Sequence, residues 1–196
     1  MAADAFVTSR EAAELLGVSL RTVQLWVEND VLQAWKTAGG HRRISRRSVD
    51  RILKQQQQAS GLTAGDGTPV VLVVEDNAEM RRLYERYFQL WQLPARLLVA
   101  ANGFEGLIRI GQHSPRLVIT DLSMPGMDGF QMIKALHSGN GLQDMQLMVV
   151  TGLSHAEISE NGGLPSEIEI KQKPVNFKEL EPDIRQRLGI KLVQQV

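Results

Sequence analysis

The residues with the clearest chemical potential are acidic side chains that directly follow aliphatic runs. Glu75 and Asp76 come after the run Val70 to Val74, and Asp121 comes after the run Leu117 to Thr120. Three carboxylates at one edge of a fold repel each other unless a divalent cation neutralises them. A few carboxylates together with water and a substrate phosphate form the usual environment of Mg²⁺ in proteins. The pattern therefore predicts a Mg²⁺ site.

A hydroxyl and an ammonium group follow two later aliphatic runs. Thr151 comes after the run Gln146 to Val150, and Lys173 stands before Pro174 in the next such segment. A phosphoryl group on Asp121 would have its oxygens met by Mg²⁺, by the Thr151 hydroxyl and by the Lys173 ammonium. Phosphoryl transfer requires an electrostatic clamp of this kind. We predict that Asp121 accepts phosphate, with Thr151 and Lys173 as its catalytic partners.

An alternation of strands and helices must position these residues. We expect strands over 70–74, 95–100, 117–120, 146–150 and 168–171, and helices over 78–91 and from 103, 129, about 155 and 177. Strands rich in Val, Leu and Ile that alternate with helices indicate a parallel sheet covered on both faces. The prediction is an α/β domain with a five-stranded, doubly wound parallel sheet. In such sheets functional groups gather beyond the carboxyl ends of the strands.

The first fifty residues have a different pattern. Thr8 or Ser9, with Glu11, is typical of a helix N-cap, and Ser19 is expected to cap a second helix. The second helix is expected to bury Leu20, Val23, Trp26 and Val27 and to leave Arg21, Thr22, Gln24 and Glu28 on its other side. A hairpin over 32–44 and a third helix from 46 follow. Two helices, a wing and a helix make a smaller N-terminal domain.

Charge and composition divide the chain at the same place. The net charge of the 196 residues is zero, but residues 1–58 carry nine Lys and Arg against six Asp and Glu, and the remainder carries 13 against 16. Several basic residues fall in one short stretch, as a phosphate-contacting surface requires: His41, Arg42, Arg43, Arg46, Arg47 and Arg51. Residues 55–69 have linker composition. We expect domains at 1–54 and 70–196, joined by this linker.

The lack of cysteine and of long apolar segments indicates where the protein is located. The chain has no cysteine, which excludes disulfide and thiolate-metal frameworks and gives no sign of an oxidising compartment. The N-terminal residues contain no apolar segment of the kind found in signal peptides, and no aliphatic run approaches the roughly 20 residues of a membrane span. We expect a soluble, cytoplasmic protein with no membrane partner.

The C-terminal motifs resemble those of two-component response regulator receiver domains. The similar segments, within residues 70–189, are VLVVEDNAEMRRLY, VITDLSMPGMDGFQMI, VVTG and KQKPV. The resemblance implies a flavodoxin-like receiver that catalyses only its own phosphotransfer and dephosphorylation, with a histidine kinase or phosphotransfer protein as phosphodonor. It implies Glu75, Asp76, Asp121 and the carbonyl of Ser123 as Mg²⁺ ligands, and a cis bond between Lys173 and Pro174.

One position departs from the receiver pattern. Family members commonly carry an aromatic switch residue three positions before the lysine, where this chain has Ile170. Rotation of an aromatic ring therefore does not report phosphorylation here. Whether phosphorylation drives dimerisation is left open by this substitution.

Residues 7 to about 54 resemble the winged helix-turn-helix of MerR-type activators and excisionases. The resemblance implies that the second helix enters the major groove of double-stranded DNA and that the wing contacts the backbone or minor groove. The implied contacts are Ser19, Arg21, Thr22 and Gln24 on the helix and His41, Arg42 and Arg43 on the wing. One small reading head gives limited affinity, so we expect a homodimer on two half-sites.

Two other functions compete with a phosphorylation-controlled transcription regulator. The first is an architectural, excisionase-like DNA-binding protein whose receiver serves for pairing or docking independently of phosphorylation. The second is an aspartyl-phosphate hydrolase. Those enzymes typically carry a second aspartate two positions after the first, where this chain has Ser123. The hydrolase is therefore the weaker alternative.

Overall fold

The computed structural model describes residues 6–28, 30–37, 42–54, 68–137 and 145–190. Its larger part is built on a parallel sheet of five strands in the order β5-β4-β6-β7-β8. The strands are β4 (Val70–Val74), β5 (Arg96–Ala100), β6 (Leu117–Thr120), β7 (Gln146–Thr151) and β8 (Glu169–Gln172). The doubly wound parallel fold expected from the sequence is confirmed.

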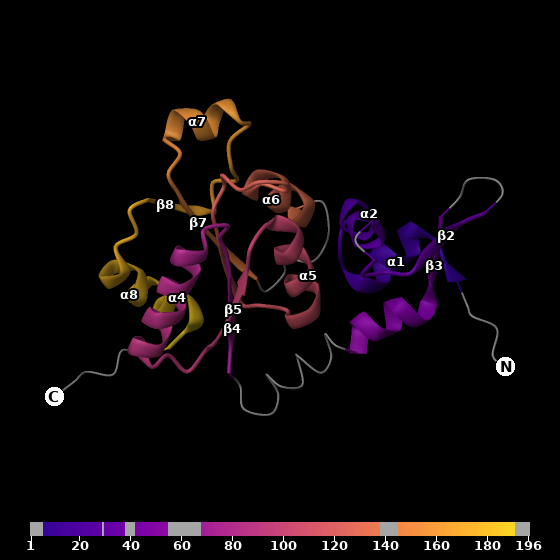
Figure 1. Ribbon diagram of the computed structural model, residues 1–196, viewed down its shortest axis with the longest axis horizontal. Coiled ribbons are helices and arrows are strands. Elements are labelled where there is room, and N and C mark those ends of the chain that lie inside the picture. The colour runs from indigo at the N-terminus through magenta and orange to yellow at the C-terminus, as the bar shows by residue number, and fades with distance from the viewer. Residues whose placement is uncertain (1–5, 29, 38–41, 55–67, 138–144, 191–196) are drawn as a thin grey trace.

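Helices cover both faces of this sheet. One face carries α4 (Ala78–Trp91) and α8 (Phe177–Leu188), and the other carries α5 (Gly103–His113), α6 (Gly129–His137) and α7 (His155–Glu160) (Figure 1). Side chains alternate along a strand, so Val71 and Val73 of β4 pack toward α4 and α8, whereas Leu72 and Val74 pack toward α5 and α6. All of β4 is buried, as a central strand covered on both sides requires.

The N-terminal domain is a small helical bundle with an antiparallel sheet on one side. Its elements are β1 (Phe6–Val7), α1 (Ser9–Leu16), α2 (Leu20–Glu28), β2 (Ala34–Lys36), β3 (Arg42–Ser45) and a helical segment over 46–54. The sheet order is β1-β3-β2, so β2 and β3 form the expected wing. Thr8 caps α1 in a reciprocal hydrogen-bonded box with Glu11. The predicted winged helix-turn-helix is confirmed.

The buried face of α2 differs from the predicted one. Leu20 is 45% exposed, although its spacing predicts a core position, and Thr22, predicted on the exposed side, is 2% exposed. Val23 and Trp26 lie in the core of their own domain as expected. Leu25 is also buried, but it belongs to the hydrophobic cluster of the larger domain. Helix α2 therefore buries two faces, and a pattern with one apolar face describes only one of them.

The remaining differences are small. The two-residue strand β1 was not anticipated, and β8 begins and ends one residue later than predicted. Residues 55–67 of the expected linker lie outside the described residues. In the part of the chain that the structure describes, no helix combines the length and apolar character needed to cross a membrane.

Candidate functional site

The predicted chemical residues meet at the carboxyl edge of the parallel sheet. Glu75 and Asp76 follow β4, Asp121 follows β6, Thr151 ends β7 and Lys173 follows β8. Because β4, β6 and β7 are adjacent and parallel, their ends bring side chains far apart in sequence to one place. The peptide bond between Lys173 and Pro174 is cis, as expected from the sequence.

Lys173 is the cation at the centre of this site. Its Nζ lies 2.6 Å from Oδ2 of Asp121 and 2.8 Å from Oε2 of Glu75. Burial opposes the charge on the ammonium, but its hydrogen bonds to Asp121 and Glu75 outweigh burial and raise the pKa of Lys173 above its ordinary value. Lys173 therefore remains protonated. It connects the segment after β8, the strand at one end of the sheet order, to the ends of β4 and β6.

One ammonium does not balance the acidic group. Oxygen atoms of Glu75, Asp76 and Asp121 all lie within 4.8 Å of one another. Glu75 is 2% exposed and Asp121 is 6% exposed, whereas Asp76 faces solvent. Three carboxylates against one ammonium leave a net negative site with an open side. Hard oxygen ligands beside solvent are the environment that fits Mg²⁺, which keeps several of its own waters.

The carboxylate of Asp121 is held in a fixed orientation by its own loop. Its Oδ1 accepts hydrogen bonds from the backbone N–H of Leu122 at 2.6 Å and of Ser123 at 3.1 Å. Ser123 lies on this loop, and metal ligation by its carbonyl stays a prediction. Gly129 packs beneath the loop, where a Cβ atom would lie 2.1 Å from the Asp121 carbonyl oxygen. Only glycine fits this position.

Thr151 is close to the site but turned toward its own loop. The side chain is fully buried, and its Oγ1 accepts a hydrogen bond from the backbone N–H of Leu153 at 3.3 Å. The Thr151 carbonyl accepts from the N–H of Lys173 at 2.8 Å, which joins the ends of β7 and β8. Among the described residues no hydrogen bond joins Thr151 to Asp121.

Sequence reasoning did not identify two residues near the acidic loop, Arg81 and Tyr84. Nη1 of Arg81 donates to the backbone carbonyls of Glu75 and Asp76, each at 2.7 Å. Tyr84 lies buried nearby, and burial, followed by the charges of Glu75 and Asp121, raises the pKa of its phenol. From the sequence alone, an arginine with this role cannot be distinguished from an arginine that is simply exposed on the first turns of a helix.

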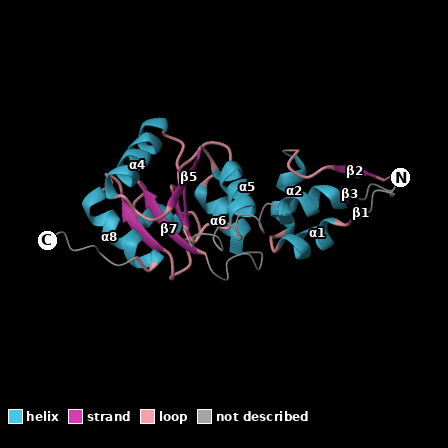
Figure 2. Cartoon of the chain, turned by 90° about the horizontal axis from the view of Figure 1, so that it is seen from below, coloured by secondary structure: helices cyan, strands magenta, loops and turns pink. Residues whose placement is uncertain are grey.

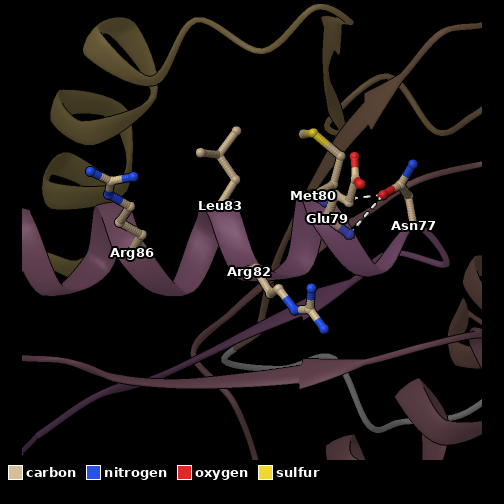
Figure 3. Close-up of a pocket in the computed structure, with 6 residues that line it drawn as sticks. All are labelled: Asn77, Glu79, Met80, Arg82, Leu83 and Arg86. Atoms are coloured by element: carbon tan, nitrogen blue, oxygen red, sulfur yellow. Dashed lines mark hydrogen bonds between the residues drawn. The ribbon is translucent and has the colours of Figure 1, made fainter.

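A groove lies along the N-terminal part of α4, which follows Asp76 in the chain. It is lined by Asn77, Glu79, Met80, Arg82, Leu83 and Arg86 (Figure 3). Asn77 is the N-cap of α4, and its side chain accepts hydrogen bonds from the N–H groups of Glu79 and Met80. The groove combines two partly buried apolar side chains, Met80 and Leu83, with two exposed arginines.

The predicted DNA-contacting residues of α2 fall into two groups. Arg21 is exposed and Gln24 is partly exposed. Ser19 and Thr22 are buried, and their hydroxyls lie 2.8 Å apart. Ser19 Oγ also accepts the backbone N–H of Thr22 at 3.0 Å, so it caps the helix as predicted. These two hydroxyls organise the start of α2.

The wing carries the remaining predicted DNA contacts. Arg42 and Arg43 lie on β3 and are partly exposed. Arg42 pairs with Glu28 of α2 at 3.5 Å, and Nη1 of Arg43 donates to the Arg42 carbonyl at 3.4 Å. His41 lies outside the described residues. The ion pair of Arg42 with Glu28 is partly exposed, and such pairs are weak, so it does not hold Arg42 away from a phosphate backbone.

Comparison with known proteins agrees with this architecture. The model of the response regulator receiver domain family matches residues 71–185, and a helix-turn-helix domain model matches residues 6–57. A probable transcriptional regulator, ycf27, of Porphyra purpurea is 31% identical over 115 residues, which are 59% of this chain and 45% of that protein. Hybrid signal transduction histidine kinase D of Dictyostelium discoideum is 29% identical over 55% of this chain and 7% of its own length. The chain thus spans less than half of each of these relatives.

A solved structure shows the same receiver fold. The receiver domain of a Francisella response regulator superposes with a TM-score of 0.54 at 23% identity, and the match covers 62% of this chain and 98% of that one. Because the receiver family model matches more than half of its length, and the acidic residues and the lysine lie at the expected strand ends, the chain belongs to the response regulator receiver family.

Proposed function

We propose that this chain is a DNA-binding response regulator whose control of transcription depends on phosphorylation of Asp121. The observation that carries the proposal is the arrangement of Lys173 between Asp121 and Glu75 beside a cluster of three carboxylates. A helix-turn-helix domain in the same chain supplies the output. The working units are residues 1–54 for DNA and 70–196 for phosphoryl transfer, joined by 55–69.

The geometry supports a direct transfer from a phosphohistidine. An oxygen of Asp121 forms a bond to phosphorus as the N–P bond breaks, and the imidazole leaves with the electron pair and takes up a proton. The ammonium of Lys173 already contacts the Asp121 carboxylate. It would pair with the negative charge of a phosphoryl oxygen once the phosphoryl group is bound there. Mg²⁺, held by Glu75, Asp76 and Asp121, would neutralise the phosphoryl oxygens. Thr151 would turn from its own loop to donate a hydrogen bond.

The partners follow from the two surfaces. We propose that a histidine kinase or a phosphotransfer protein rests on the groove of α4, since the residues that line this groove begin at Asn77, directly after Asp76 in the chain. Double-stranded DNA would contact α2 and the wing, and a homodimer would bind two half-sites. The receiver turns over no other substrate in this scheme.

An intact-mass measurement tests the phosphoryl chemistry. The full chain is incubated with Mg²⁺ and acetyl phosphate, and the mass is recorded at intervals. We expect one phosphoryl adduct in the wild type and in Asp128→Asn, a matched change on the same loop. The adduct should be absent in Asp121→Asn and in wild type treated with a chelator. An adduct that survives Asp121→Asn would refute the assignment.

A further inference from the structure

The surface of the receiver formed by α5 and α6 is occupied by the N-terminal domain. Helix α2 contacts both α5 and α6, and both views place the small domain beside these helices (Figures 1 and 2). Leu25 of α2 is 3% exposed and is part of the hydrophobic cluster of the receiver, while Ile108 of α5 packs against the core of the helix-turn-helix domain. Each domain thus contributes an apolar side chain to the other.

One close approach in this interface depends on a glycine. A Cβ atom at Gly111 of α5 would lie 2.3 Å from Cη2 and 2.4 Å from Cζ2 of Trp26, and the three nearest atoms all belong to that ring. No real Cβ tolerates such distances, so the ring rests directly on the helix backbone. Glycine in a helix interior costs stability relative to alanine. The interface, and not the helix, accounts for glycine at this position.

The part of α2 that the receiver covers lies among its predicted DNA contacts. Leu25 stands four positions after Arg21 and three after Thr22, so these side chains are neighbours on one side of the helix. The major groove, about 12 Å wide, admits one helix. A helix that already carries α5 and α6 against this side cannot enter the groove fully. The docked arrangement therefore competes with DNA.

The two docking helices are tied to the phosphorylation loop. The N–H of Gly129, at the start of α6, donates to the carbonyl of Leu122 at 3.1 Å, and the N–H of Gly103, at the start of α5, donates to the carbonyl of Met127 at 3.1 Å. The N–H of Leu122 donates to Asp121 itself. One loop thus connects Asp121 to the starts of both helices, and this connection does not pass through Ile170 or β8.

We infer that the α5 and α6 face of the receiver is a docking surface for the recognition helix of the same chain, and that docking withholds this helix from DNA. Leu25 and Trp26 are the anchors, and Gly111 makes room for the Trp26 ring. Release of α2 by phosphorylation of Asp121 is the regulatory consequence, which rests on the proposed function. The docking itself is inferred from the packing between the two domains alone.

DNA binding by the full-length Gly111→Ala variant tests the docking. The probe is a fluorescein-labelled, mixed-sequence duplex at low salt, read by fluorescence anisotropy. An added methyl group should push Trp26 away while favouring helix α5, so we expect about tenfold tighter binding than wild type, equivalent to about 1.4 kcal/mol. Gln131→Ala, an exposed change on α6, should bind as wild type does. Ile108→Gln provides a second route to release that leaves Gly111 intact.

Hydrogen exchange separates docking from its trigger. Amides of α2 should exchange faster in Gly111→Ala than in wild type, and equally fast when Asp121→Asn is added. The docking inference is overturned if Gly111→Ala and Ile108→Gln both bind DNA and exchange as wild type does. If these variants bind more tightly but acetyl phosphate leaves wild-type binding unchanged, docking stands and the proposed phosphorylation control fails.

Discussion

The phosphorylation site and the DNA-binding surface of this chain are built in opposite ways. At the first, Glu75, Asp121 and Lys173 already touch in the protein alone, because strand ends of one sheet place them. At the second, Arg21 and Gln24 are accessible, but Leu25 beside them is buried against another domain. When the strand ends of a single sheet carry the side chains of a site, those side chains come together once the sheet forms. A surface that contacts both a neighbouring domain and DNA is available to DNA only when the domain moves away.

The largest expected effect comes from removing the cation of the preformed site. Lys173→Met leaves the buried carboxylates of Glu75 and Asp121 without their ammonium, and uncompensated buried charge costs about 3 kcal/mol of unfolding free energy. Urea unfolding in the absence of divalent cations measures it. Lys178→Met, an exposed lysine on α8, should change stability little. Equal stability of the two variants would show that Lys173 does not hold the site together.

Metal binding tests how complete the preformed site is. Mg²⁺ at about 100 times its dissociation constant should stabilise the folded protein by about 2.7 kcal/mol. The same concentration of Mg²⁺ should stabilise Asp76→Asn much less, since one of three carboxylates is lost. The control variant Asp128→Asn should be stabilised as much as the wild type. Thermal or urea unfolding with and without Mg²⁺ gives the comparison. Stabilisation of Asp76→Asn equal to that of the wild type would remove Asp76 from the ligand set.

Substitutions in the wing test the DNA-binding surface. Changing Arg42 and Arg43 together to Ala should weaken binding to every duplex and lower the slope of log affinity against log salt by about 2, if each contacts one phosphate. The matched control changes Arg82 and Arg86, two exposed arginines on α4, in the same way. A salt slope unchanged by the first pair, or lowered equally by the second, would contradict a specific role of the wing.

The two regions also differ in what their residues reveal before a structure is known. Aliphatic runs of strand length predict the strands that precede Glu75 and Asp121 and the strand that ends at Thr151. Functional groups of such sheets gather beyond the carboxyl ends of the strands, which predicts where these side chains meet. Arg81 escaped notice because its partners are backbone carbonyls of a loop, which have no residue signature. Leu25 escaped because helical periodicity reports burial against one core, and its partner is a second domain.

The smallest expected effect concerns α5, the helix that lies between the two regions. Burial alone would raise the pKa of Glu105, but hydrogen bonds from the Ala101 N–H and from Arg109 outweigh it, so the pKa lies below the ordinary value of 4.5. A carboxyl whose pKa is lower in the folded state contributes stability above its unfolded pKa and loses it as the pH falls through its folded pKa.

Glu105→Gln should therefore lower the free energy of unfolding at pH 6 by less than about 1 kcal/mol, because the exposed part of the pair is screened by solvent. The difference from wild type should shrink as the pH falls below 4.5, the ordinary value for this carboxyl. Urea unfolding of both proteins at pH 6 and at the lowest pH where the wild type stays folded measures the change. Glu85→Gln, an exposed position on α4, is the control. A difference that grows with acid would contradict the assignment of Glu105, and it would weaken the view of α5 as a firmly capped helix against which α2 docks.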